Sequence, residues 1–285
     1  MGELVLAAKV THVPSMMICE QPGPHFGKRD FAIAGHREIG RRLRDLGATS
    51  VVVFDTHWLV NSGFHVNSCA RYSGLHSSNE FPQFIHDLPY DIPGNPALGS
   101  AIAQRATAAG VKVLSHQIQS LDLEYGTLVP IHYMDPQNDL KVVSVAAWCP
   151  WHLHSDSRVI GAAVREAIEA SDERVAILAS GSLSHRIHDN RDGAAGLFTI
   201  SDEFHRQVDL QVLQLWREGR WREFTAMLPT YAVACHGEGL MHDTAMLLGA
   251  LGWDAYEGKA EVITDWFASS GTGQCNVVLP VTSTR

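Results

Sequence analysis

The stretch Val51-Val52-Val53-Phe54-Asp55-Thr56-His57 decides how this chain folds. Three β-branched residues followed by a phenylalanine are typical of a strand that is buried on both faces, as in a parallel sheet. The apolar run stops at Asp55, and His57 follows two residues later. Because ligands of open α/β sheets bind beyond the carboxyl ends of the strands, a histidine at this place is a candidate ligand.

Further apolar runs of strand length alternate with helical patterns along the chain. Strands are predicted at residues 4–10, 142–147, 175–179, 260–267 and 277–281. Helices are predicted at residues 30–46, 95–110, 155–170, 201–216, 221–227 and 243–251. This order predicts one α/β domain over residues 1–285: an α/β/α sandwich around a largely parallel or mixed central sheet, with a helical insertion in the C-terminal part.

Composition limits the functions that the chain can have. With 285 residues, 45% of them hydrophobic, it can bury a sizeable core. A formal net charge of −9 and the lack of a basic run argue against a nucleic-acid partner. Five scattered cysteines favour reduced thiols. Glu3 and Lys9 interrupt the N-terminal apolar run, and no stretch approaches a membrane span, so we expect a soluble cytoplasmic protein.

Three histidines follow predicted strands at corresponding ends. His12 comes two residues after the strand at 4–10, and His57 comes two residues after Asp55. His185 follows the strand at 175–179 through a loop of small residues. If these strands run parallel, their carboxyl ends meet at one edge of the sheet, and we expect the three imidazoles to converge there.

His12, His57 and Glu238 form a candidate metal-ligand set. Two imidazole nitrogens and one carboxylate oxygen can hold Fe(II) on one face and leave the opposite face open for substrate and O2. Glu238 stands between Gly237 and Gly239, and glycine permits backbone angles that can aim a carboxylate inward. The structural alternative is that the histidines cap loops and that Glu238 is a turn carboxylate.

His185 and Tyr125 are candidates for proton transfer and hydrogen bonding. A histidine with an ordinary pKa near ~6.5 can take up and return a proton near neutral pH. The alternative is that His185 is a surface residue in a polar loop. The phenol of Tyr125 can hydrogen-bond to bound oxygen or to a ring substituent, or it can be a half-buried aromatic beside a turn.

Long runs of the sequence resemble one known family. They are Thr11-His12-Val13-Pro14-Ser15, residues 53–62, residues 123–130, residues 179–186, Gly237-Glu238-Gly239 and residues 267–274. In these runs, which are spread over nearly the whole chain, it resembles the type III (LigB-type) extradiol ring-cleavage dioxygenases. Within that family it looks most like the branch that acts on 3,4-dihydroxyphenylacetate, also called homoprotocatechuate.

The resemblance implies a site and a reaction. His12, His57 and Glu238 would bind Fe(II), and His185 would be the active-site base. Many members have Asp-His-Gly where this chain has Glu124-Tyr125-Gly126, so we expect Tyr125 to make the oxygen-side hydrogen bond in place of a second histidine. The implied reaction inserts O2 into a catechol ring between carbons 2 and 3 and gives a semialdehyde.

The implied substrate carries a side-chain carboxylate, which needs a cationic partner. Arg186, next to the candidate base, and Arg29, in an early loop, are the residues that we expect to supply it. The family also suggests a homo-oligomer, a dimer or a tetramer. Three alternatives remain: a 2-aminophenol-cleaving dioxygenase, a zinc-dependent hydrolase on the same ligands, and a non-enzymatic binding protein that kept the fold.

Overall fold

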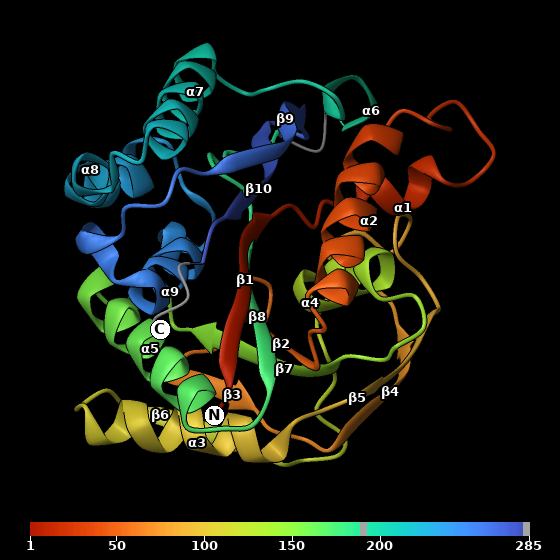
Figure 1. Cartoon of the computed structure of the whole chain (residues 1–285). Helices are drawn as coiled ribbons and strands as arrows, with labels where there is room; N and C mark the ends of the chain where they lie inside the picture. Colours follow the sequence, from red (N-terminus) through yellow and green to blue (C-terminus); the bar gives the residue numbers. More distant parts are fainter. Residues whose placement is uncertain (189–192, 282–285) are drawn as a thin grey trace.

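A mixed sheet forms the centre of the molecule (Figure 1). The computed structural model describes residues 1–188 and 193–281, and in these ranges eight strands belong to this sheet. They are β1 (Glu3–Val10), β2 (Ser50–Asp55), β3 (Phe64–Asn67), β6 (Val113–His116), β7 (Lys141–Ala147), β8 (Arg174–Ser180), β9 (Glu261–Ser269) and β10 (Thr272–Leu279). Their order in the sheet is β6-β3-β7-β2-β8-β1-β10-β9.

The centre of the sheet is parallel and its margins are mixed. Strands β7, β2, β8 and β1 run parallel to one another. β10 pairs antiparallel with both β1 and β9, and β3 pairs antiparallel with β7. β4 (Arg71–His76) and β5 (Leu88–Pro93) form a separate antiparallel pair. The prediction of an α/β fold around a largely parallel or mixed sheet is therefore confirmed.

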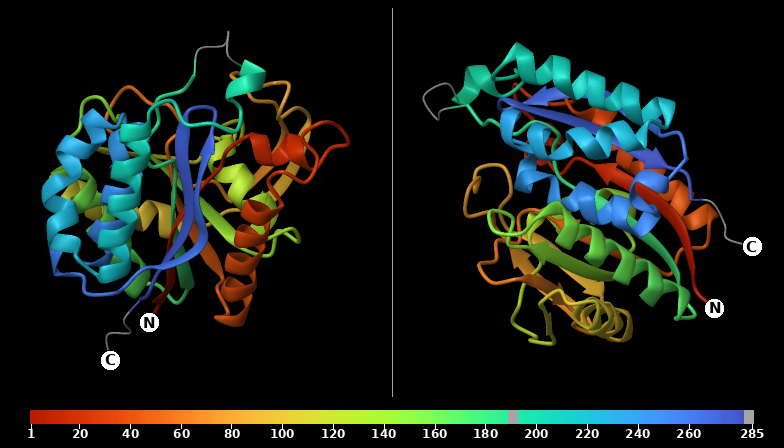
Figure 2. Two further views of the ribbon diagram at one scale, coloured as in Figure 1. Left: turned by 90° about the horizontal axis from the view of Figure 1, so that it is seen from above. Right: turned by 90° about the vertical axis from the view of Figure 1, so that its left-hand side faces the viewer.

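Helices cover both faces of the sheet (Figure 2). One face carries α1 (Ser15–Cys19), α2 (Asp30–Asp45) and α4 (Tyr125–Met134). The other carries α3 (Pro96–Ala108), α5 (His154–Glu169) and α9 (His242–Leu251). The C-terminal part adds α6 (Gly193–Gly196), α7 (Glu203–Glu218), α8 (Trp221–Ala234) and the short 3-10 helices η2 (Glu238–Met241) and η3 (Trp253–Ala255). None of the described helices has both the length and the apolar character needed to cross a membrane.

The run 51–54 shows why the sheet is buried on both sides. Val51 and Val53 belong to the apolar cluster that includes α2 and α4, whereas Val52 and Phe54 belong to the cluster on the opposite face. This alternation is the two-residue period of a strand. All four side chains are fully buried, and burial of each contributes on the order of 1.5–3 kcal/mol.

Several elements differ from the sequence predictions. No helix was predicted at Tyr125, where α4 begins, and the helix predicted to stop near residue 227 continues to Ala234. Both helices contain an internal proline, Pro130 or Pro229, which is a signal for helix termination in a sequence. The short strands β3, β4, β5 and β6 were not predicted, because four to six residues with mixed polarity carry little periodicity.

The sheet brings the carboxyl ends of three strands level with one another. Val10 at the end of β1 is in register with Ser180 at the end of β8, and Asp55 at the end of β2 is in register with the same residue. The segments that carry His12 and His57 leave the sheet from this edge. The predicted convergence of parallel strand ends is therefore confirmed.

A buried histidine links α2 to this edge. One ring nitrogen of His36, Nε2, lies 2.9 Å from the carbonyl oxygen of Thr11, and Nδ1 lies 3.3 Å from the amide nitrogen of Asn276. Nδ1 also lies 3.0 Å from the carbonyl oxygen of Ala32, and a neutral ring, with its single N–H, can donate to only one of the two carbonyl oxygens. Burial lowers the pKa of His36 to about 4.

This histidine predicts a loss of stability in acid. The folded-state pKa of about 4 lies below the ordinary 6.5, so the unfolded chain binds the proton first as the pH falls. We expect the free energy of unfolding to drop by roughly 3 kcal/mol from this group between pH 6.5 and 4. Urea unfolding across this range, compared with His36→Gln, measures it, and identical pH slopes in the two proteins would contradict it.

Candidate metal centre and reactant pocket

Two imidazoles face one buried carboxylate at the level edge of the sheet. His12 Nε2 lies 3.0 Å from Glu238 Oε1, and His57 Nε2 lies 3.2 Å from the same oxygen. One donor atom from each of the three residues lies within 4.8 Å of the others. The structure thus brings together three side chains that are separated by up to 226 positions in the sequence.

The position of the proton on His12 follows from its other contact. Ser180 Oγ donates its one hydrogen to the carbonyl oxygen of Gly126 at 2.5 Å, so it accepts a hydrogen bond from His12 Nδ1 at 2.9 Å. The neutral ring then has a lone pair on Nε2, directed at the carboxylate of Glu238. Two electron-rich atoms 3.0 Å apart require a second proton or a cation between them, and this arrangement fits a bound metal.

His57 is held by a turn at the end of β2. Asp55 Oδ1 accepts hydrogen bonds from the backbone nitrogens of His57 (2.7 Å) and Trp58 (3.2 Å), and Oδ2 accepts from Thr127 Oγ1 (2.6 Å). A Cβ atom on Gly126 would lie 2.1 Å from Asp55 Oδ1. Glycine is therefore required at the start of α4 for the helix to approach this turn.

Glu238 is fixed by hydrogen bonds from two further segments. Thr56 Oγ1 donates to Oε1 and the backbone nitrogen of Ser182 donates to Oε2, both at 2.5 Å. Gly239 has the left-handed backbone (φ 51) expected for it, but Gly237 (φ −50) does not. The sequence interpretation of Gly237 was wrong, because this glycine does not serve an unusual backbone angle. It leaves room for Met241, whose Cγ would lie 2.6 Å from a Cβ atom added to Gly237.

Charge in the site favours an ionised carboxylate. Glu238 is only 4% exposed, and burial alone would raise its pKa. The neighbouring imidazoles of His12, His185 and His57 hold the pKa of Glu238 well below its usual range instead. An anionic oxygen beside two imidazole nitrogens is a donor set that suits a divalent transition metal.

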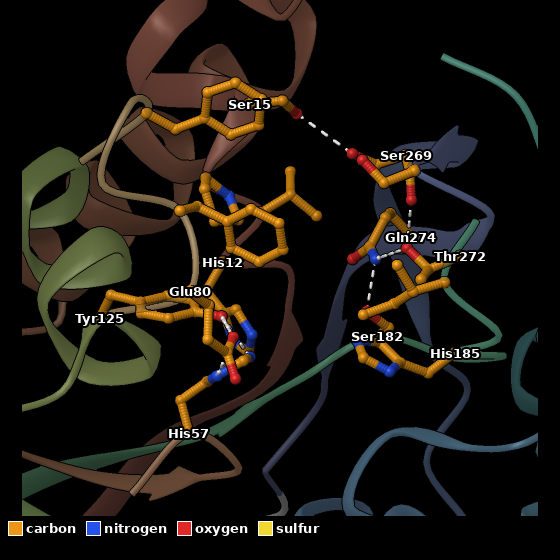
Figure 3. A pocket seen from close by; sticks show the side chains of 16 residues that line it. His12, Ser15, His57, Glu80, Tyr125, Ser182, His185, Ser269, Thr272 and Gln274 are labelled. Atoms are coloured by element: carbon orange, nitrogen blue, oxygen red, sulfur yellow. Dashed lines mark hydrogen bonds and ion pairs between the residues drawn. The ribbon is translucent and has the colours of Figure 1, made fainter. Parts of the chain in front are cut away.

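His185 and Tyr125 border the same centre (Figure 3). His185 Nε2 lies 3.7 Å from Glu238 Oε2, and burial lowers the pKa of His185 below its usual value. The Tyr125 hydroxyl lies 2.9 Å from His57 Nε2. Burial, reinforced by the carboxylate of Glu80, raises the pKa of Tyr125 far above its usual value, so the phenol stays protonated.

These residues line a pocket that is open to solvent. Its titratable side chains, His12, His57, Glu80, Tyr125 and His185, gather near the metal site. Hydroxyl and amide groups extend along one wall from beside His185 to the opposite end, where the hydroxyl oxygens of Ser15 and Ser269 lie 3.1 Å apart (Figure 3). The remaining lining residues are Val13, Pro14, Phe81, Phe84, Ser182, Ile187, Ser270, Thr272 and Gln274.

Some of these residues were missed in the sequence. The hydroxyl wall from Ser269 to Gln274 lies in a run that resembles the family, and that run was the available signal. Glu80, Phe81 and Phe84 lie in a connection without periodicity or motif, so no sequence signal distinguished them. The pocket is therefore lined by more residues than the sequence motifs identify.

The two candidate arginines do not line this pocket in the described part of the chain. Arg29 is 2% exposed and lies behind Ser15, to whose Oγ it donates from Nε at 3.1 Å. Its Nη2 donates to two backbone carbonyl oxygens. Arg186 is 59% exposed, and its Nη1 lies 3.9 Å from Asp202. Direct contact of either guanidinium with a molecule in the pocket is not a feature of this structure.

Comparison with known proteins identifies the family. Residues 6–280 match the family described as the catalytic LigB subunit of aromatic ring-opening dioxygenase. The chain belongs to this family of aromatic ring-opening dioxygenases. It is an extradiol dioxygenase rather than a hydrolase or a non-enzymatic scaffold, as the sequence resemblance implied.

Individual relatives agree with this placement. The chain is 52% identical over 259 residues to 3,4-dihydroxyphenylacetate 2,3-dioxygenase of Escherichia coli, which covers 91% of this chain and 94% of the relative. It is 26% identical over 247 residues to the 2-aminophenol 1,6-dioxygenase beta subunit of a Pseudomonas species, covering 81% and 79%. An uncharacterised protein of Escherichia coli K12 shares the fold, with a TM-score of 0.66 at 14% identity over 97% of this chain and all of that one.

The hydrogen bond from His12 to Ser180 predicts an effect on metal affinity. In Ser180→Ala the imidazole loses the acceptor that fixes its proton on Nδ1, so the metal-facing lone pair is no longer held in place. We expect metal affinity to fall about 10- to 100-fold, measured by competition with a chelator. Ser157→Ala is the matched control, because Ser157 is also buried and its Oγ lies 2.7 Å from Nδ1 of a histidine, His242. Neither residue lines the pocket. Equal affinities of the two variants would contradict the prediction.

Proposed function

We propose that this protein is an Fe(II) extradiol dioxygenase that cleaves 3,4-dihydroxyphenylacetate between ring carbons 2 and 3. Both atoms of O2 enter the product, a carboxymethyl-hydroxymuconic semialdehyde. The observation that carries this proposal is a His-His-Glu donor set, with a histidine and a tyrosine around one pocket, in a chain 52% identical to a relative named for that reaction.

His12, His57 and Glu238 would hold the iron. When bound there, Fe(II) supplies the electronic connection between a catechol and O2, and three protein ligands leave other positions open for both reactants. The side chains around the ion have separate tasks. Ser180 and Asp55 keep the two imidazole segments in place, and Thr56 and the Ser182 backbone keep the carboxylate in place.

His185 is the proposed base. Its lowered pKa leaves the ring neutral at neutral pH, so a ring nitrogen can accept a proton from a catechol hydroxyl. The resulting imidazolium would be stabilised by Glu238, 3.7 Å away, and could return the proton to the ring-opened product. Tyr125, on the other side of the pocket, contributes a hydrogen bond to the reactants.

The substrate carboxylate is assigned to the Ser15–Ser269 end of the pocket. Arg29 is a buried cation, and no carboxylate in the described part of the chain forms an ion pair with it. A buried charge without a counter-ion is costly, so an anionic group that enters next to Ser15 gains from this positive charge. Arg29 would therefore act through Ser15 and not by direct contact. The exposed Arg186 has no part in this assignment.

Oxygen consumption tests the proposed function. Protein reconstituted anaerobically with Fe(II) should consume O2 with 3,4-dihydroxyphenylacetate and give a product that carries both atoms of 18O2, detected by mass spectrometry. Zinc-loaded protein is the control and should consume none. Faster turnover of 2-aminophenol would favour the second reading, which the likeness to the aminophenol-cleaving subunit supports. No uptake by iron-loaded protein with either compound would overturn both.

Substrate selectivity tests the assignment of the carboxylate. In Ser15→Ala, the hydroxyl that links Arg29 to the pocket is removed, and a lost hydrogen bond to a charged group costs about 1.5–3 kcal/mol. We expect kcat/KM for 3,4-dihydroxyphenylacetate to fall by roughly tenfold or more. Turnover of 4-methylcatechol, which lacks the carboxylate, should change little. A parallel loss for both compounds would mean that Ser15 supports the pocket without recognising charge.

A further inference from the structure

Glu80 is a pocket residue whose contacts lead to Tyr125. It lies in the connection between β4 and β5, and its Oε2 accepts a hydrogen bond from the Tyr125 hydroxyl at 3.0 Å. The same oxygen lies 3.7 Å from His57 Nδ1. Glu80 is 49% exposed, so water reaches one side of this carboxylate while the other side faces the pocket.

The connection that carries Glu80 is held by its own hydrogen bonds. The backbone nitrogen of Phe81 donates to Ser78 Oγ (3.0 Å). The backbone nitrogen of Ser78 donates to the carbonyl oxygen of Ile85 (3.0 Å), and the backbone nitrogen of Ile85 donates to the carbonyl oxygen of Phe81 (3.1 Å). Ile85 is buried and anchors the turn. The position of Glu80 is therefore set by a closed turn and not by the side chain alone.

Counting hydrogens fixes the direction of the hydrogen bonds at Tyr125. A phenol has one hydrogen, and an ionised carboxylate only accepts. Where a metal holds the lone pair of His57 Nε2, that nitrogen cannot accept, so the Tyr125 hydrogen points to Glu80 and the phenol oxygen presents its lone pairs to the pocket. If His57 Nε2 is a metal ligand, it has no hydrogen to donate. The phenol oxygen then needs a donor from the reactants.

We propose that Glu80 is a positioning residue that turns the Tyr125 hydroxyl into a hydrogen-bond acceptor for a hydroxyl group of the bound catechol. This inference rests on the proposed function, because it requires a substrate with a hydroxyl group next to the metal. It gives Tyr125 a defined direction: the tyrosine receives a hydrogen bond from the substrate and does not donate one to it. Glu80 itself does not contact the reacting atoms.

A series of variants at Glu80 and Tyr125 tests this direction in the iron-loaded enzyme. Glu80→Ala removes the acceptor, and we expect kcat/KM to fall about tenfold. Glu80→Gln keeps an acceptor oxygen, so its kcat/KM should stay within about threefold of the parent enzyme. In Tyr125→Phe, Glu80→Ala should cause no further loss, because Glu80 acts only through the phenol.

A second readout avoids turnover. The dissociation constant of 3,4-dihydroxyphenylacetate, measured anaerobically by titration calorimetry, should follow the same order, with Glu80→Ala weakened and Glu80→Gln close to the parent enzyme. Metal content should not change in any variant. Glu20→Ala is the matched control, because Glu20 accepts a 2.9 Å hydrogen bond from Tyr133 on the same helix, α4, outside the pocket. It should leave both readouts unchanged.

The outcomes are distinct. Equal losses in Glu80→Gln and Glu80→Ala would show that negative charge matters and not hydrogen-bond direction, and would overturn the proposal. Additive losses in the double variant would overturn it as well, because Glu80 would then act without Tyr125. If the parent enzyme consumed no O2 with catechols, the proposed function would fail first. Normal turnover by Glu80→Ala with an active parent enzyme would refute the role of Glu80 alone.

Discussion

The contact of one buried carboxylate with two imidazole nitrogens is the constraint on which the rest of this structure depends. An isolated carboxylate in the protein interior is strongly disfavoured, so Glu238 is stable only where donors surround it. Thr56 and Ser182 donate hydrogen bonds to it, and His12 and His57 place ring nitrogens beside it; these residues follow three different strands. The strands must therefore end at the same level, and the parallel register of β1, β8 and β2 achieves this.

The metal ligands and the rest of the pocket lining come from different parts of the fold. The metal-binding side chains lie within two residues of strand ends or are hydrogen-bonded to them, so their geometry depends on buried backbone. The residues that face the remainder of the pocket, Glu80 and Phe84 among them, lie in a longer connection. Changes in that connection can alter substrate choice without moving the ligands. This division fits relatives that are named for different aromatic substrates.

The sequence predicts the ligands far better than it predicts the pocket. His12, His57 and His185 each follow a strong apolar run, and the position of a strand end is a local property. Glu80 and Arg29 depend on how distant segments pack, which no local pattern encodes. Arg29 was expected to contact the substrate, but its guanidinium is enclosed by Ser15 and backbone oxygens. The helix predicted at 221–227 continues past Pro229, and α4, which was not predicted, contains Pro130; tertiary packing maintains both helices despite the missing hydrogen bond.

Charge along the pocket provides a reason for substrate orientation. Glu80 and Glu238 lie near the metal-binding end, whereas the buried Arg29 lies behind Ser15 at the opposite end. A catechol with an anionic side chain that entered in reverse would place its carboxylate away from Arg29 and lose the attraction of that buried positive charge. In the proposed orientation the same carboxylate faces two hydroxyl groups, and the guanidinium of Arg29 lies behind one of them. The field of the protein thus selects the orientation in which the catechol hydroxyls approach the metal ligands.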